Sequence, residues 1–195
     1  MSKQTDFIAA IAPGAQTGQR VYGVLASVTI AQAILESGWG ESALTKASNN
    51  LFGIKAGSGW NGRAIEYSTK EYINGQYVST TGVFRAYDSM ADSVEDHGKF
   101  LASLARYKNV IGCTDYHDAT QALQEAGYAT APNYAEILCQ LIEQYDLANY
   151  DRPQSLPMLY TFSCVVSGGD LADFEAMAVE KKLKHVNKEA FTGEY

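Results

Sequence analysis

The chain has 195 residues, of which 46% are hydrophobic and 19% are charged, so it carries enough apolar material for one hydrophobic core. The 15 basic and 22 acidic residues leave a net charge of −7, whereas a nucleic-acid-binding protein needs a cationic face that pairs with phosphates. The composition therefore predicts a folded globular protein that binds neither nucleic acid nor an anionic membrane surface.

The cysteines and the N-terminus exclude further classes. Cys113, Cys139 and Cys164 form no CxxC pair and have no paired histidines, so we expect neither a metal site nor a disulfide framework. Residues 1–16 contain one lysine and a short apolar run that Pro13-Gly14 interrupts, which is a poor signal peptide. No stretch approaches the roughly 20 apolar residues of a membrane span. We therefore expect no membrane insertion and a chain made in the cytoplasm; a secreted protein lacking its leader is the alternative.

Residues 6–47 follow a helical pattern. Ser27 is a candidate N-cap, and an apolar stripe at helical spacing runs through Val24, Val28, Ala31 and Leu35. A polar stripe with the same spacing contains Thr29, Gln32 and Glu36.

Glu36 is a candidate catalytic acid. Gly38 is expected to end the helix, which leaves Glu36 in the last turn beside Trp39. The helix dipole and the apolar neighbours both disfavour an anion there, so the pKa of Glu36 should rise. Hydrolysis of a polysaccharide needs a carboxylic acid that is still protonated near neutral pH. A solvated glutamate at a helix end is the alternative interpretation.

Residues 61–87 predict a β-hairpin. Asn74-Gly75 lies between two runs of β-branched and aromatic residues, which is a strong hairpin signal. With this turn, Ile73 lies opposite Gln76 and Glu71 opposite Val78. Glu71 and Ile73 then share one side of the ribbon.

The rest of the chain predicts helices, a linker and an appendage. Ser89 and Asp92 form a capping box for a helix, and further helices are expected at 117–126 and 133–145. Residues 148–157 are polar with two prolines and are expected to be a linker. Residues 158–195 predict a strand, a Gly168-Gly169 turn and a helix, which could pack on the body, pair with a second copy of the chain, or be loosely ordered. The expected fold class is α+β, with a mainly helical body, a small β-hairpin lobe and this short appendage.

Other polar residues have simpler explanations. His97 lies on an apolar helix stripe and is expected to be a hydrogen-bonded core residue. Ser37 could orient Glu36 or cap the helix end, and Asp88 is expected to be a turn residue. The sequence contains no G-x-S-x-G motif and no phosphate-binding loop.

Five blocks occur in an order that resembles a known family. They are AQAILESGWG (31–40), SNNLFGIKA (48–56), TKEYINGQYV (69–78), FRAYDSMADSVEDHGKFL (84–101) and GYATAPNYAEIL (127–138). Together they resemble the glucosaminidase family, glycoside hydrolase family 73, which includes bacterial autolysins, flagellar rod-cap hydrolases and phage lysins. The resemblance implies a lysozyme-like catalytic domain over residues 1–147, followed by the linker at 148–157 and the appendage at 158–195, a candidate wall-binding or dimerisation segment.

The resemblance also implies an activity. Members act as endo-β-N-acetylglucosaminidases on the β-1,4 bond between N-acetylglucosamine and N-acetylmuramic acid, so the expected partner is a peptidoglycan glycan strand and no cofactor is expected. Without a leader, the chain looks most like a phage endolysin released through a membrane lesion. A secreted autolysin is the alternative.

Carried over by motif, the resemblance implies roles for single residues. Glu36 matches the general acid, Glu71 the second catalytic carboxylate, and Tyr128 the tyrosine of the Y-A-T motif, which lines the site and contributes to catalysis. The residues expected to shape the sugar groove or bind substrate are Trp39, Asn50, Phe52 and Tyr134. Ala131 stands where the family commonly has an aspartate that would cap the following helix.

Several alternatives stay open at this point. The second carboxylate could be Glu66 or Asp88 instead of Glu71, and the mechanism could be retaining, inverting or assisted by the substrate's own N-acetyl group. The enzyme could also be a muramidase or lytic transglycosylase acting on the same polymer. A non-catalytic wall-binding or virion module is the alternative from another functional class.

Overall fold

The computed structural model describes residues 2–73 and 76–151, and for residues 69–73 and 76–79 it describes the backbone alone. The chain divides into two compact units, Met1–Gln154 and Ser155–Tyr195. The predicted appendage at 158–195 lies outside the described residues, so its strand, its helix and its pairing with a second copy stay predictions.

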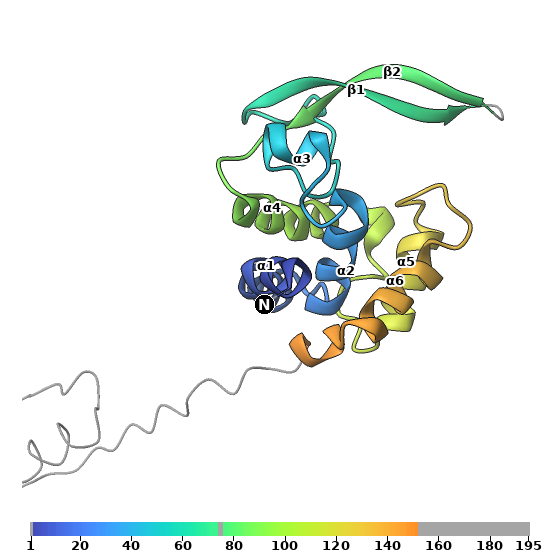
Figure 1. The fold of residues 1–195 in the computed structure, drawn as a ribbon. Helices are drawn as coiled ribbons and strands as arrows, with labels where there is room; N and C mark the ends of the chain where they lie inside the picture. Colours follow the sequence, from blue (N-terminus) through green and yellow to red (C-terminus); the bar gives the residue numbers. More distant parts are fainter. Residues whose placement is uncertain (1, 74–75, 152–195) are drawn as a thin grey trace, which may run out of the picture. The chain divides into compact units, whose positions relative to one another are not determined.

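The first unit is a helical body with one β-hairpin (Figure 1). In chain order its elements are α1 Lys3–Tyr22, α2 Ala26–Ser37, α3 Ala43–Ser48, β1 Ala64–Ile73, β2 Gln76–Arg85, α4 Met90–Ser103, the 3-10 helix η1 Ala105–Tyr107, α5 Tyr116–Glu125, α6 Tyr134–Gln144 and the 3-10 helix η2 Leu147–Tyr150. This arrangement confirms the predicted α+β class. No helix within residues 2–73 and 76–151 has both the length and the hydrophobicity of a membrane span.

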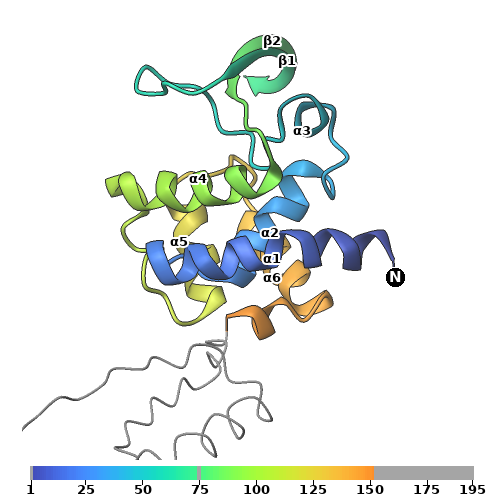
Figure 2. The ribbon, with the colours of Figure 1, turned by 90° about the vertical axis from the view of Figure 1, so that its left-hand side faces the viewer.

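Helix α2 lies at the centre of the body, with α1, α6 and η2 packed around it (Figure 2). Every residue from Ala26 to Ile34 is buried, as expected for a helix that is covered on all sides. The predicted N-cap was wrong: the cap position is Leu25, and Ser27 lies inside the first turn. The backbone N–H of Ser27 donates instead to Asp151 Oδ1 at 2.7 Å, a partner 124 residues further along the chain.

Helices α1 and α4 approach closely because each has a glycine at the contact. A Cβ on Gly14 would lie 3.2 Å from Val94, and a Cβ on Gly98 would lie 2.6 Å from the ring of Tyr22. Helix α1 continues through Pro13-Gly14, although a proline inside a helix is unfavourable. Buried apolar residues on both sides of the proline, packed against α4, outweigh the backbone hydrogen bond that proline removes.

The hairpin has the predicted register, with Ile73 opposite Gln76 and Glu71 opposite Val78. The pairing is one-to-one along both strands, so alternate residues stay on the same face. Ile65 and Tyr67 are half-buried on one face, whereas Glu66 on the other face is exposed.

Helix α4 begins with the predicted Ser89–Asp92 capping box. At the other end of the unit, the first residues of the predicted linker belong to the body. The carbonyl of Tyr150 accepts a hydrogen bond from Gln16 Nε2 at 3.1 Å, and that of Asp151 accepts one from Gln19 Nε2 at 3.0 Å. The polar composition of residues 148–157 suggested a linker. The sequence alone does not reveal that side chains of α1 donate to this segment.

Candidate active site

The end of α2 sets the position of Glu36. Gly38 adopts the left-handed conformation with φ 55°, and its N–H donates to the carbonyl of Ile34. The hydroxyl of Ser37 donates to the carbonyl of Ala33 and accepts the N–H of Gly40 at 2.7 Å. Of the two predicted roles for Ser37, the structure therefore shows the capping role.

The carboxyl of Glu36 lies between protein and solvent. Solvent reaches the residue on one side, while packed protein on its other sides raises the pKa of the carboxyl by burial. The hydroxyl of Tyr134 donates to Glu36 Oε1 at 2.8 Å, which lowers the pKa. Burial is the larger effect, so the pKa is raised, in the direction that the sequence predicted.

Tyr134 and Gln32 form a buried chain behind the acid. Tyr134 is 2% exposed and Gln32 is completely buried. Gln32 Nε2 donates to the hydroxyl oxygen of Tyr134 at 3.0 Å, and Tyr134 in turn donates to Glu36. Burial, followed by the charge of Glu36, raises the pKa of Tyr134 far above its usual range, so this residue stays a phenol and remains a donor.

Aromatic rings continue from Tyr134 into the core. Tyr128 stacks on Tyr134 with ring centroids 5.8 Å apart, and His97 meets Tyr128 edge-on at 6.2 Å. Phe52 stacks on the ring of His97, with ring centroids 3.9 Å apart. Burial and then the charge of Glu36 raise the pKa of Tyr128 well above its usual range. The Y-A-T tyrosine therefore lies within electrostatic reach of the acid.

His97 is buried in the core, as predicted, but the expected hydrogen bond is not found. Neither ring nitrogen has a hydrogen-bond partner in the described part of the chain. Burial lowers the pKa of His97 to about 3, so its ring is neutral at physiological pH.

Asn50 organises the loop after α3. Its Oδ1 accepts the N–H groups of Phe52 and Ile54, at 3.3 and 3.1 Å. Its Nδ2 donates to the carbonyls of Ile54 and Arg85, at 3.0 and 2.9 Å. Because these four bonds use the full capacity of the amide, Asn50 shapes the loop through its backbone contacts.

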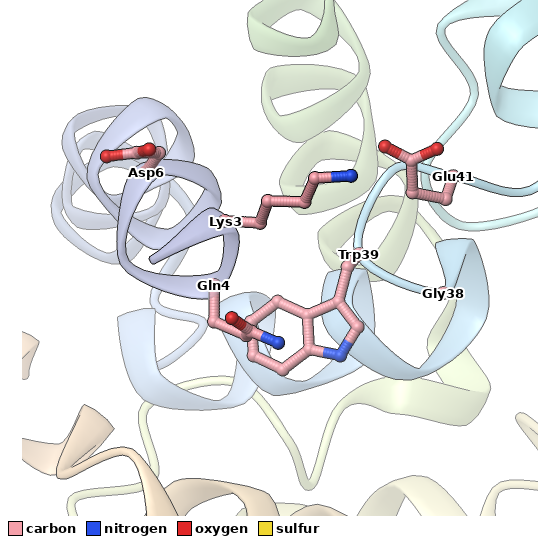
Figure 3. Close-up of a pocket in the computed structure, with 6 residues that line it drawn as sticks. All are labelled: Lys3, Gln4, Asp6, Gly38, Trp39 and Glu41. Atoms are coloured by element: carbon pink, nitrogen blue, oxygen red, sulfur yellow. The ribbon is translucent and has the colours of Figure 1, made fainter. Parts of the chain in front are cut away.

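Trp39 lines a hollow beside the N-terminal turn of α1 (Figure 3). Its ring packs edge-on against Phe7 and Tyr145, with centroids 5.9 and 4.9 Å apart. The hollow has a volume of about 380 Å³ and is lined by Lys3, Gln4, Asp6, Gly38, Trp39 and Glu41. Glu36 is not among these lining residues.

A family model describes most of this unit. The Glucosaminidase model, described as mannosyl-glycoprotein endo-beta-N-acetylglucosaminidase, matches residues 12–147. The chain belongs to the glucosaminidase family. The catalytic domain of the autolysin Auto from Listeria monocytogenes has a similar structure, with 38% identity, a TM-score of 0.68, and coverage of 77% of this chain and 89% of that domain. The predicted lysozyme-like fold class is thereby confirmed.

Curated relatives are longer than this glucosaminidase chain. The exo-glucosaminidase LytG of Bacillus subtilis is 38% identical over 156 residues, which are 77% of this chain and 55% of LytG. The peptidoglycan hydrolase FlgJ of Pseudomonas aeruginosa is 40% identical over 144 residues, which are 71% of this chain and 36% of FlgJ. The match therefore spans about half or less of each relative.

The candidates for the second carboxylate of the glucosaminidase site differ in placement. The side chain of Glu71 lies outside the described residues, but its backbone position is in phase with Ile65 and Tyr67 on the half-buried face of the hairpin. Glu66 belongs to the opposite, exposed face. Asp88 is exposed and lies 3.4 Å from Arg63 Nη1. Of the three, Glu71 alone has a backbone position in phase with the half-buried residues of the hairpin.

The first turn of α6 is capped from another helix. The N-cap residue of α6, Asn133, makes no side-chain capping bond. Instead, Gln124 of α5 accepts the N–H of Ala135 at 2.9 Å, so one free donor of the first turn of α6 is satisfied.

Within residues 2–73 and 76–151, no three His, Cys, Asp or Glu side chains gather in a group that could hold a metal ion.

Sequence reasoning missed the hydrogen bond of Gln32 at this candidate site, and it assigned Tyr134 to substrate binding alone. The available signal was the four-residue spacing of Gln32 and Glu36, which places both on one face of α2. The hydrogen bonds with Tyr134 join residues 98 and 102 positions apart, and no local pattern indicates them.

Proposed function

We propose that this chain is a peptidoglycan N-acetylglucosaminidase that hydrolyses the β-1,4 bond between N-acetylglucosamine and N-acetylmuramic acid, with Glu36 as general acid. The observation that carries the proposal is the state of the Glu36 carboxyl. Burial raises its pKa, so it stays protonated to higher pH, and the hydroxyl of Tyr134 donates a hydrogen bond to it. Solvent still reaches the residue. It lies in a domain of the glucosaminidase family, whose relatives include named peptidoglycan hydrolases.

The chemistry follows from that carboxyl. Glu36 gives its proton to the glycosidic oxygen as the bond to the anomeric carbon breaks, and water then adds to that carbon. The product gains a new N-acetylglucosamine reducing end. The hydrogen bond from Tyr134 stabilises the carboxylate that remains on Glu36, so the acid can lose its proton inside a partly buried site.

Glu71 is the proposed second carboxylate, which stabilises the developing positive charge on the sugar or activates water. Its support is the family motif and its backbone phase on the half-buried face of the hairpin. The substrate-assisted route needs no such residue, because the N-acetyl group of the sugar itself attacks the anomeric carbon. If the mechanism is retaining or inverting, Glu71→Gln should therefore lose much more activity than Glu66→Gln. If the mechanism is substrate-assisted, Glu71→Gln should lose little activity.

The deciding experiment is digestion of purified peptidoglycan with product analysis by mass spectrometry. Glu36→Gln keeps the size of the side chain and removes the transferable proton, so the rate should fall by about 10²- to 10⁴-fold. Glu95→Gln, an exposed carboxylate on α4, is the matched control and should keep the wild-type rate.

The products separate the alternatives. New N-acetylglucosamine ends support the proposal, new N-acetylmuramic acid ends indicate a muramidase, and anhydro-sugars indicate a lytic transglycosylase. A wild-type chain that binds walls, never cleaves them, and behaves like Glu36→Gln would be a wall-binding module.

We propose endo-type cleavage, in agreement with the description of the family model. LytG is named an exo-glucosaminidase, so exo-type cleavage is the competing outcome. Endo-type cleavage shortens the average glycan strand early in the digestion, whereas exo-type cleavage releases small fragments while long strands persist.

We propose peptidoglycan as the macromolecular partner and the cell wall as the place of action. At a net charge of −7, the protein gains no general attraction to an anionic wall, so affinity has to come from stacking and hydrogen bonds with the sugars or from residues 158–195. Release as a phage endolysin and wall binding by residues 158–195 stay predictions from the sequence.

A further inference from the structure

The hydroxyl of Tyr134 has one hydrogen and two neighbours. It lies 2.8 Å from Glu36 Oε1 and 3.0 Å from the side-chain nitrogen of Gln32. Since Gln32 donates to the phenol oxygen, the phenol hydrogen is free to point at the carboxyl of Glu36. Tyr134 and Gln32 are buried, so water does not compete for these bonds.

We propose that Gln32 is a positioning residue for Glu36: by donating to Tyr134, it directs the phenol hydrogen to Glu36 Oε1 and keeps the transferable proton on Oε2. This inference rests on the proposed role of Glu36 as general acid. An oxygen that already accepts the hydrogen of Tyr134 is the poorer place for the acidic proton, so the proton stays on the other oxygen.

The reversed arrangement would fail during the reaction. If the amide of Gln32 presented its oxygen to Tyr134, the phenol would donate to Gln32, and Glu36 would have to place its own proton on Oε1, facing Tyr134. That proton would point away from the sugar. After proton transfer, the carboxylate of Glu36 would face the lone pairs of the phenol, which is repulsive.

The arrangement seen in the structure serves both states of the acid. The proton leaves Oε2 for the glycosidic oxygen, which also takes the electron pair of the breaking bond, and Glu36 becomes a carboxylate. The bonds from Gln32 to Tyr134 and from Tyr134 to Oε1 need no rearrangement, so the site is already organised for the charge that develops.

The surrounding groups leave this chain of bonds intact over the working pH range. Among the described residues, the titratable groups that interact with Glu36 are Tyr134 on α6 and Tyr128 in the segment before it. Burial raises the pKa of both phenols far above the usual range, so both stay neutral. The amide oxygen of Gln32 has no hydrogen-bond partner in the described part of the chain, so the amide is held by its bond to Tyr134.

The test is a double-mutant cycle on the full chain with Gln32→Met and Tyr134→Phe. Methionine has a similar length and no donor, so Gln32→Met should lower kcat by about 10-fold with little change in KM, because part of the Glu36 population now carries its proton on Oε1. Tyr134→Phe should lower kcat at least as much. Since Gln32 acts through Tyr134, adding Gln32→Met to Tyr134→Phe should cause no further loss.

Thr29→Val is the matched control, because Thr29 is a buried polar residue on the same helix, seven residues before Glu36. It should keep the kcat of the wild type. Equal losses in Gln32→Met and Thr29→Val, or losses that multiply in the double variant, would overturn the inference and leave Gln32 a packing residue.

A second measurement does not depend on turnover. In a carbon-13 NMR titration of the Glu36 carboxyl, Tyr134→Phe should raise the pKa because it removes the bond that lowers it, and Gln32→Met should raise it less. A pKa unchanged in Gln32→Met contradicts the inference. If the wild type cleaves peptidoglycan and Glu36→Gln does not, this contradiction concerns the role of Gln32 alone and leaves the proposed function intact. If the wild type never cleaves peptidoglycan, the proposed function itself fails.

Discussion

Two glutamates five residues apart show how strongly local surroundings determine acidity. Burial raises the pKa of Glu36 despite the opposing hydrogen bond from Tyr134. Glu41 is exposed, and the hydrogen bond and charge of Lys46 lower its pKa. The same side chain is therefore prepared as an acid at one position and as a surface anion at the other.

At the same scale, buried His97 should make stability depend on pH. Its pKa is about 3 in the folded state and about 6.5 in an unfolded chain, so below pH 6.5 the unfolded state binds more protons. The contribution of His97 to stability is complete above pH 6.5 and declines by up to about 1.4 kcal/mol per pH unit as the pH falls toward 3. His97→Phe keeps a ring beside Phe52 and should flatten this part of the curve.

Chemical denaturation between pH 4 and 7 measures the effect. The difference in unfolding free energy between His97→Phe and wild type should shift in favour of the variant as the pH falls. His117→Gln, at an exposed position on α5, controls for the loss of a histidine as such. A difference that stays constant over this range would show that His97 has the same pKa in the folded and unfolded states.

At the scale of elements, close packing of α1 against α4 fixes one side of the body. The contact depends on a glycine in each helix, Gly14 facing Val94 and Gly98 facing Tyr22. Glycine lowers helix propensity, so two glycines in long helices are tolerated here because they let the backbones approach.

Two alanine substitutions separate packing from propensity. Gly98→Ala places a methyl group 2.6 Å from the ring of Tyr22 and should destabilise the protein by about 1–3 kcal/mol, even though alanine favours the helix. Gly18→Ala, in α1, meets no atom within 4 Å and should stabilise by about 0.5–1 kcal/mol. Urea denaturation of both variants gives the two free energies. A Gly98→Ala variant as stable as wild type, or more stable, would mean that the helix contact does not depend on Gly98.

At the scale of the whole molecule, the N-terminus of the central helix depends on the end of the first unit. Asp151 accepts the N–H of Ser27 at 2.7 Å, and Tyr150 packs against the core. An anionic side chain at a helix N-terminus is favourable, so residues after Leu147 stabilise the helix that carries Glu36.

Truncation tests this dependence. A chain of residues 1–147 lacks Asp151 and Tyr150, and should be less stable than a chain of residues 1–154 by about 2 kcal/mol, half from the helix terminus and half from lost burial. In a thermal melt this corresponds to a Tm lower by about 4–8 °C. Asp151→Ala in the longer chain should reproduce about half of the loss. Equal Tm values for the two chains would assign these residues to the linker.

Much of the architecture could be predicted because its signals are local. The capping box at Ser89, the hairpin register around Asn74-Gly75 and the end of the acid-bearing helix at Gly38 each depend on residues within a few positions of one another. The wrong N-cap at Ser27 arose where a distant contact, the hydrogen bond with Asp151, outweighs local preference.

The sequence by itself determined the family, the helix that carries Glu36, and the fact that the pKa of Glu36 is raised. These features depend on the order of the motifs and on residues close to the end of the helix. Tertiary structure decided what surrounds the acid: Tyr134, the buried amide of Gln32, and the capping of α2 by Asp151. These groups come from segments about 100 or more residues apart, and only the packing of helices around α2 brings their hydrogen-bonding atoms within 3 Å of one another.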